Sequence, residues 1–296
     1  MEIKVIFETD FKDLVLLKRG KVRDIYDLGK HLLIISTDRL SAFDVVFNEA
    51  IPYKGVVLNK LSEFWFAKTS QIIENHFVSS EIVKHYPDLQ IYSEELKQRA
   101  MLVKKAEIIP FECIVREYLM GSAYEDYKRR GKVGSVKLME GLELGSKLKE
   151  PIFTPSTKQD LGHDRNIGYE EFEEALGSKK ASFIKEISIK LFKYASDYLL
   201  EKGLIIVDTK FEFGEIGGRT ILVDEIFTPD SSRFLFKEDY EKGVINRSLD
   251  KQFVRDYLNR IGWNREPPPP HLPKEVIEET SKRYLEIYNL ITGLTL

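Results

Sequence analysis

Two short runs of apolar and β-prone residues lie near the start of the chain, at residues 21–28 and 32–37. The intervening Gly29-Lys30 provides a short, glycine-containing connection, which is typical of a β-hairpin. The chain is therefore predicted to begin with antiparallel β-structure.

A helical spacing of apolar residues follows the predicted hairpin. Leu58, Leu61 and Trp65 recur at intervals of three and four, which predicts an amphipathic helix over residues 56–73. The short apolar or β-prone runs at residues 101–105 and 111–116 predict two further strands. The first third of the chain is thus predicted to consist mainly of β-structure.

The pattern changes to a helix around Gly121-Ser122. Ser122 and Glu125 have the spacing of a capping box, and Gly131 suits the exit from the helix. A longer helix is predicted over residues 183–202, with Gly203 at its C-cap.

The last third of the chain contains a second predicted hairpin. Strands are predicted at residues 204–213 and 220–227, joined by the glycine-rich segment 214–218. Four consecutive prolines follow at 267–270, and residues 274–290 are predicted to form a final helix after Pro273.

These elements predict an α+β fold with antiparallel sheets, two lobes and a C-terminal helix. Residues 1–107 are predicted to form a β-rich nucleotide-binding lobe, and residues 108–266 an α+β lobe that binds substrate and metal. Residues 267–296 are predicted to form a stiff proline connector and a helix that packs back onto the body.

The composition narrows the class of partner. The 296 residues include 45 Lys+Arg and 48 Asp+Glu, a formal net charge of −3, which argues against a nucleic-acid partner. The single cysteine, Cys113, excludes an internal disulfide. We recognise no signal peptide and no apolar window of membrane-spanning length, so we expect a cytoplasmic protein without a membrane partner.

The second hairpin carries the strongest chemical signal. Asp208, Lys210 and Glu212 alternate along one strand and are predicted to share a face. Folding back through the glycine turn brings Asp224 near Glu212. Two carboxylates on one face suit Mg2+, which takes one or two carboxylates together with phosphate oxygens. A solvated hairpin face with a surface salt bridge explains the same residues equally well.

Two further groups of residues suggest anion binding. Lys21 and Arg23 are predicted to share a strand face beside a hairpin turn, where they could meet nucleotide phosphates, although exposed charged edges are common. Arg116 ends a strand, and Ser122 begins a helix whose free N–H groups favour a phosphate. Arg233 could bind the same phosphate, whereas Ser122 could be only a helix cap. We find no P-loop, Rossmann or protein-kinase signature.

Seven segments in order resemble the SAICAR synthetase family, from about residue 19 to residue 257. Two of them, I-I-P-F-E-C-I-V-R-E-Y-L-M-G-S and I-V-D-T-K-F-E-F-G, are similar to the signature segments of the family. The other five are G-K-V-R-D-I-Y, S-T-D-R-L-S-A-F-D, K-G-V-V-L-N-K, I-F-T-P-S-T-K and V-D-E-I-F-T-P-D-S-S-R. The length resembles the longer form of the family.

The resemblance implies an ATP-grasp-like fold and a ligase of purine biosynthesis. Such an enzyme uses ATP and Mg2+ to join CAIR, the carboxylated aminoimidazole ribonucleotide, to L-aspartate through an acyl phosphate, and releases ADP and phosphate. The implied ATP contacts are Lys21, Arg23, Lys104, Glu107 and Ile109, the implied catalytic residues are Lys210 and Asp208, and the implied Mg2+ ligands are Glu212 and Asp224.

The resemblance also implies residues that bind the substrates. The CAIR phosphate would be held by Arg116, Ser122 and Arg233. The remaining implied substrate residues, on the CAIR or aspartate side, are Ser41, Asp44, Asn59, Lys60, Asp230, His163, Asp164 and Asn166. The central loop departs from the family pattern, because G-H-D-R-N stands where the longer form usually reads G-E-H-D-x-N.

Two alternatives belong to other functional classes. A related small-molecule phosphotransferase would form a phosphorylated product without an amine, and a non-catalytic nucleotide-binding protein would be expected to lack Lys210, Glu212 or Asp224. All three residues are present. The protein is expected to act as a monomer or a homodimer.

Overall fold

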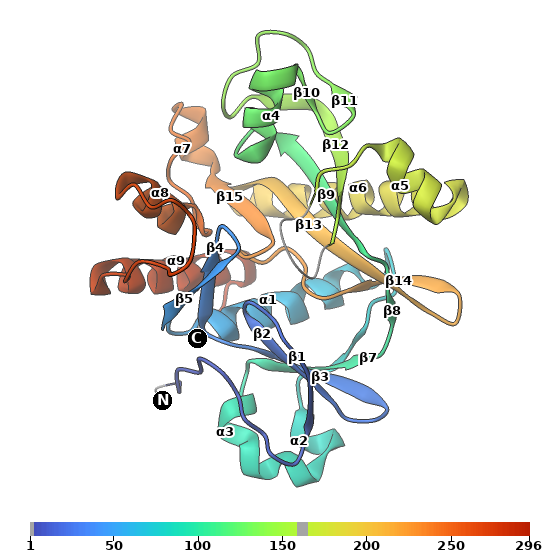
Figure 1. Cartoon of the computed structure of the whole chain (residues 1–296), viewed down its shortest axis with the longest axis vertical. Helices are drawn as coiled ribbons and strands as arrows, with labels where there is room; N and C mark the ends of the chain where they lie inside the picture. Colours follow the sequence, from blue (N-terminus) through green and yellow to red (C-terminus); the bar gives the residue numbers. More distant parts are fainter. Residues whose placement is uncertain (1–2, 159–164) are drawn as a thin grey trace.

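The computed structural model describes residues 3–158 and 165–296. Two antiparallel sheets dominate this part of the chain, with α6 and α9 packed beside them (Figure 1). Among the described residues, no helix is both long and apolar enough to cross a membrane. The prediction of an α+β fold with antiparallel sheets and a C-terminal helix is confirmed.

The first sheet has the strand order β1-β2-β3-β7-β6. Its strands are β1 (Val15–Arg19), β2 (Arg23–Asp27), β3 (His31–Ser36), β7 (Ala100–Lys104) and β6 (Phe77–Ser79). Beside it lie the hairpin β4 (Arg39–Ala42) and β5 (Val45–Ala50), helix α1 (Lys54–Thr69), and the short helices α2 (Ile82–His85), η1 (Pro87–Tyr92) and α3 (Ser93–Leu96).

The second sheet has the order β12-β9-β13-β14, and β15 and β8 also pair with β13. Its strands are β12 (Lys147–Thr157), β9 (Phe111–Tyr118), β13 (Leu204–Ile216), β14 (Arg219–Val223), β15 (Ser232–Phe236) and β8 (Glu107–Ile108). The small hairpin β10 (Lys132–Val133) and β11 (Val136–Lys137) stands apart from it.

The helices of this part are α4 (Ser122–Arg130), α5 (Tyr169–Leu176), α6 (Ser178–Glu201), α7 (Lys237–Glu241), α8 (Gln252–Arg260) and α9 (Lys274–Thr292). One hydrophobic core joins α1, α6 and α9 to both sheets, and Trp65 and Tyr284 are completely buried in it. The C-terminal helix therefore packs on the body of the protein and lies beside α1 (Figure 1).

Several predicted boundaries are wrong for physical reasons. Helix α1 begins at Lys54 and ends at Thr69. Ile73, the last residue of the predicted helix, is buried but lies in the turn that follows α1. Strand β2 begins at Arg23, so Lys21 lies in the connection between β1 and β2 and not on a strand. Helix α6 ends earlier than predicted, with Lys202 at its C-cap and Gly203 after it.

The predicted capping box at Ser122 is also wrong. Gly121 is the N-cap of α4, and its φ of 55° is a backbone conformation that favours glycine. The Gly121 carbonyl accepts hydrogen bonds from the backbone N–H groups of Tyr124 and Glu125, at 3.1 and 3.2 Å. Ser122 is consequently the first residue of the helix, and its hydroxyl makes no capping hydrogen bond within the described structure.

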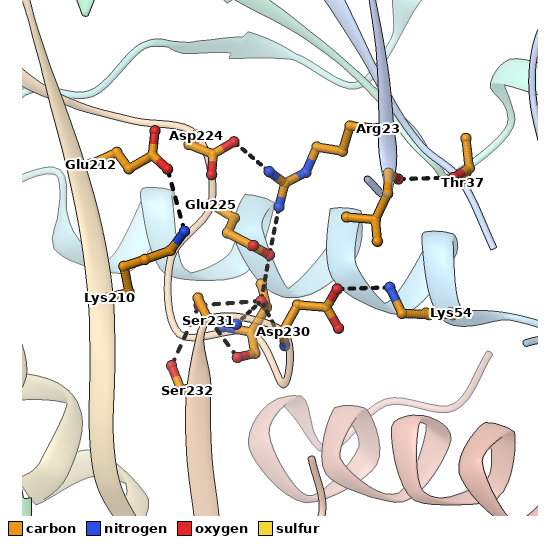
Figure 2. Close-up of polar contacts among 12 residues, drawn as sticks. Arg23, Thr37, Lys54, Lys210, Glu212, Asp224, Glu225, Asp230, Ser231 and Ser232 are labelled. Atoms are coloured by element: carbon orange, nitrogen blue, oxygen red, sulfur yellow. Dashed lines mark hydrogen bonds and ion pairs between the residues drawn. The ribbon is translucent and has the colours of Figure 1, made fainter. Parts of the chain in front are cut away.

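In the second hairpin, the first strand is longer than predicted and the second strand is shorter. Strand β13 continues to Ile216, and the turn consists of Gly217 and Gly218, whose φ values are 56° and 75°. Strand β14 ends at Val223, because Asp224 has a φ of 66° and leaves the strand. This change of direction turns the Asp224 side chain toward β2 (Figure 2).

Candidate functional site

Three cavities adjoin one another, because each shares lining residues with the others. Cavity A, of about 620 Å³, is lined by the β1–β2 connection, the β4–β5 turn and the polar face of β13. Cavity B, of about 240 Å³, is lined by β9, β13 and the segment before β15. The two share four lining residues, Glu112, Lys210, Asp230 and Arg255. Cavity C, of about 1070 Å³, continues from cavity B past α4 and α8.

The polar face of β13 forms one wall of cavities A and B. Lys210 Nζ lies 3.4 Å from Glu212 Oε1 (Figure 2). It also lies 2.5 Å from Glu112 Oε1. Burial disfavours the charged form of Lys210, but Glu212, Glu112 and Asp224 outweigh that effect and raise its pKa above the ordinary value. Lys210 therefore stays positively charged between two cavities lined with carboxylates.

Asp224 and Glu212 line cavity A from the two strands of the hairpin. Glu212 is paired in register with Val223, so Asp224 is one position beyond its direct partner. Arg23 contacts Asp224, and its Nη2 lies 2.6 Å from Glu225 Oε2 (Figure 2). Burial raises the pKa of Asp224, but Arg23, Lys210 and other cations outweigh it and hold the pKa at about 2.

This pair of carboxylates suits a nucleotide-bound cation better than an isolated metal ion. Among the described residues, no group of three or more His, Cys, Asp or Glu side chains could hold a metal. Mg2+ needs only one or two protein carboxylates when phosphate oxygens and water complete its octahedron. Glu212 and Asp224 are therefore compatible with Mg2+ that arrives together with phosphates.

Cavity B has the character of an anion site. Arg116 is 5% exposed, and it donates from Nε to Thr154 Oγ1 at 3.0 Å and from Nη1 to Asp208 Oδ2 at 2.9 Å. Arg233 Nη1 lies 3.3 Å from the same Asp208 oxygen. Ser122 completes the group at the start of α4. Two guanidinium groups thus share one carboxylate, and their combined charge remains positive.

Gly121 makes this arrangement possible. A Cβ atom at this position would overlap the Arg233 guanidinium, and the positive φ of Gly121 also disfavours any larger residue. The glycine therefore lets the start of α4 approach Arg233 directly.

Asp230 lies at the boundary of cavities A and B, and its side chain is 2% exposed. Lys54 Nζ is 2.8 Å and Lys251 Nζ 2.9 Å from its Oδ2 atom, and the Tyr284 hydroxyl donates to Oδ1 at 2.6 Å. Burial raises the pKa of Asp230, but Lys251 and Lys54 outweigh that effect and lower it.

Comparisons with known proteins agree with this geometry. The family model described as SAICAR synthetase matches residues 16–270. The chain belongs to the SAICAR synthetase family. It is 50% identical over 289 residues to the phosphoribosylaminoimidazole-succinocarboxamide synthase of Thermodesulfovibrio yellowstonii, covering 98% of this chain and 99% of that protein. The corresponding synthase of Geobacter metallireducens is 49% identical over 290 residues, with 98% of both chains covered.

Solved structures of the family have the same fold. The SAICAR synthase of Saccharomyces cerevisiae, solved in complex with SAICAR, superposes with a TM-score of 0.90 at 40% identity, covering 98% of this chain and 99% of that one. A SAICAR synthetase in complex with ADP has a TM-score of 0.70 at 26% identity, covering 94% and 98%. The chain is thus an ATP-dependent ligase of purine biosynthesis that joins CAIR and L-aspartate.

Most residues that this family resemblance implied lie around the cavities. Ser41, Lys21 and Asp44 line cavity A, and Lys21 contacts Asp44 across the tips of the two hairpins. Asn166 lines cavity C. The implied contacts His163 and Asp164 lie outside the described residues.

Other implied residues of the SAICAR synthetase site lie elsewhere. Asn59 is completely buried and donates to the carbonyls of Gln98 and Ala100, which gives it a place in the core. Lys60 is paired with Glu63 at 2.9 Å on the surface of α1. Within the described part of the chain, neither Asn59 nor Lys60 lines cavity A, B or C.

The three implied nucleotide contacts beside β7 occupy different environments. Lys104 is paired with Glu74 at 2.7 Å. Glu107 is exposed in β8, and Ile109 is buried and donates its backbone N–H to the Phe213 carbonyl at 2.9 Å. These residues form the segment that crosses from the first sheet to β13.

Sequence reasoning missed several residues that line the cavities of this SAICAR synthetase. Lys158 contacts Glu212, and Glu112 contacts Lys210. Lys251 and Arg255 lie one helical turn apart around the start of α8, and both line cavity A. The four-residue spacing of Lys251 and Arg255 indicates that the two side chains share one face of a helix. No local pattern indicates that this face is turned toward the cavities.

Proposed function

We propose that cavity A receives the phosphates of ATP and that cavity B receives the 5′-phosphate of CAIR. The observation that carries this proposal is the wall that the two cavities share, which contains Lys210 and Arg255. Arg116, Ser122 and Arg233 bind the CAIR phosphate in cavity B. The CAIR carboxylate then reaches toward Lys210, where it meets the terminal phosphate of ATP.

Glu212 and Asp224 would hold Mg2+ against the ATP phosphates, and the cation supplies charge neutralisation for phosphoryl transfer. Arg23 and Lys158 already contact these two carboxylates. Both cations therefore stand beside the bound phosphates and add to the positive field. Lys21, in the β1–β2 connection, leaves Asp44 to bind a phosphate oxygen.

The reaction follows from the chemistry of the three substrates. Direct attack of an amine on a carboxylate would have to expel oxide, which is a very poor leaving group. One CAIR carboxylate oxygen therefore attacks the γ-phosphorus of ATP, the bond to the β-phosphate oxygen breaks, and ADP leaves. The aspartate amine attacks the carbonyl carbon of the resulting acyl phosphate, inorganic phosphate departs, and the amine loses a proton.

The protein acts mainly by positioning and by electrostatics. Lys210 lies beside the phosphoryl group that is transferred, and Asp208 orients the two guanidinium groups that hold CAIR. Arg255, which lines all three cavities, binds a carboxylate of the substrates. Within the described residues we assign no nucleophilic side chain, because the mechanism needs none.

The fold is proposed to be ATP-grasp-like, with the nucleotide between two lobes that meet near Glu107. The path of the chain supports this division, because it leaves the first sheet after β7 and β8 then pairs with Gly214 and Glu215 of β13. Glu107 and Ile109 would then contact the adenine from this crossing segment. We also propose that the enzyme acts in the cytoplasm, as a monomer or a homodimer.

The experiment that distinguishes a ligase from a phosphotransferase measures the formation of ADP from ATP and CAIR with and without L-aspartate. The proposed ligase sustains ADP formation only when aspartate is present, because the acyl phosphate is consumed by the amine. Sustained ADP formation at the full rate without aspartate would favour the alternative, a phosphotransferase with a stable phosphorylated product.

A further inference from the structure

The C-terminal helix contributes one polar group to the boundary of cavities A and B. The Tyr284 hydroxyl of α9 donates to Asp230 Oδ1 at 2.6 Å, and the Tyr284 side chain is completely buried. Asp230 is otherwise bonded to Lys54, the first residue of α1, and to Lys251, just before α8. Segments far apart in the sequence therefore converge on one carboxylate.

The geometry assigns separate partners to the two oxygens of Asp230. Lys54 and Lys251 both lie against Oδ2, whereas Tyr284 bonds to Oδ1. Lys54 Nζ also lies 5.6 Å from the centre of the Tyr284 ring. The ring of Tyr284 therefore contacts Lys54, while its hydroxyl contacts Asp230. Loss of the hydroxyl would leave Oδ1 without this donor and allow the carboxylate to rotate.

Rotation of the Asp230 carboxylate would displace the ammonium group of Lys251, which is bonded to it. Lys251 lines cavity A together with Lys210 and Arg255, and its side chain is 10% exposed. Lys54 lies deeper and is completely buried. Of the two lysines bonded to Asp230, Lys251 is therefore the one whose ammonium group can face a substrate.

We propose that Tyr284 is a positioning residue of the ligase, which acts through Asp230 to hold Lys251 in cavity A, beside the wall that cavities A and B share. There Lys251 binds a carboxylate of the reacting substrates beside Lys210. This inference rests on the proposed placement of CAIR in cavity B. It makes the C-terminal helix part of the machinery that positions the reactants as well as part of the core.

The test compares Tyr284→Phe with Tyr198→Phe. Tyr198 donates its hydroxyl to the Ile291 carbonyl at 2.9 Å, so both variants remove one hydroxyl that bonds across the α9 interface, but only Tyr284 touches Asp230. We expect Tyr284→Phe to lower kcat/KM for CAIR by about tenfold and to change KM for ATP by less than about twofold. Tyr198→Phe should lower the unfolding temperature but should not lower kcat/KM for CAIR selectively.

Equal kinetic effects of the two variants, or an unchanged kcat/KM for CAIR in Tyr284→Phe, would overturn the proposal. A double-mutant cycle with Asp230→Asn provides the second criterion. If Tyr284 acts through Asp230, Tyr284→Phe has little further effect in the Asp230→Asn background. An undiminished effect there would show that Tyr284 acts by another route and would also overturn the proposal.

Arg116→Ala separates this inference from the proposed substrate placement. If Arg116→Ala raises KM for CAIR but Tyr284→Phe leaves the kinetics unchanged, only the role of Tyr284 is wrong. If neither variant affects CAIR, the placement of CAIR in cavity B is wrong, and the role of Tyr284 falls with it.

Discussion

Replacement of Arg116 by alanine is the most informative perturbation of cavity B. Arg116 is buried, and its Nη1 atom is 2.9 Å from Asp208 Oδ2. The substitution removes a guanidinium from the proposed phosphate site. It also leaves the Asp208 carboxylate facing that site with Arg233 as its remaining guanidinium partner in the described structure, at 3.3 Å. Attraction is lost and repulsion of the phosphate is added.

The size of the effect follows from these two contributions. A hydrogen bond to a charged group contributes about 1.5–3 kcal/mol, and each 1.4 kcal/mol corresponds to about a tenfold change in affinity. We therefore expect KM for CAIR to rise by about 10-fold to 150-fold in Arg116→Ala. KM for ATP should change by less than about threefold, because ATP lies in the adjoining cavity and Lys210 is unchanged.

The assay is steady-state ADP formation, with CAIR and ATP varied separately at saturating L-aspartate. Arg219→Ala is a matched control, because Arg219 has a 71% exposed side chain at the tip of the β13–β14 hairpin and is paired with Glu74. It should leave both Michaelis constants near the wild-type values. An equal rise of KM for CAIR and for ATP in Arg116→Ala would refute the assignment of cavity B to the CAIR phosphate.

Two further substitutions test the metal site and the core. Asp224→Asn should raise the Mg2+ concentration required for half-maximal activity by about tenfold or more, and a magnesium titration that matches the wild type would exclude Asp224 as a ligand. Arg99→Met should cost about 3–5 kcal/mol of stability in urea unfolding, because Arg99 and Asp38 form a buried ion pair at 2.8 Å and the variant leaves the carboxylate charge buried. A loss below about 1 kcal/mol would contradict that reasoning.

Local patterns in the sequence predicted the parts of the site that lie within one element. The alternation of Asp208, Lys210 and Glu212 was enough to place them on one face of β13, because strand geometry fixes that relation. The return of Asp224 toward Glu212 also followed from a single hairpin. The position of Gly121 at the N-cap was not predicted, since it depends on the close approach of Arg233, which is distant in the sequence.

The remaining site residues depend on tertiary packing. Lys158 contacts Glu212 across 54 positions of the chain, and Lys54 reaches Asp230 across 176. No periodicity within one strand or helix carries such information. The family resemblance implied a substrate-side role for Asn59, and packing places its side chain in hydrogen bonds to the backbone between α3 and β7 and at the start of β7.

ATP in cavity A is proposed to phosphorylate the carboxylate of CAIR in cavity B. CAIR labelled with ¹⁸O in its carboxylate tests this claim directly, by mass analysis of the inorganic phosphate released with L-aspartate. Each turnover through the acyl phosphate transfers one carboxylate oxygen to phosphate, so we predict phosphate that carries one labelled oxygen. Unlabelled phosphate, formed together with SAICAR, would contradict the mechanism.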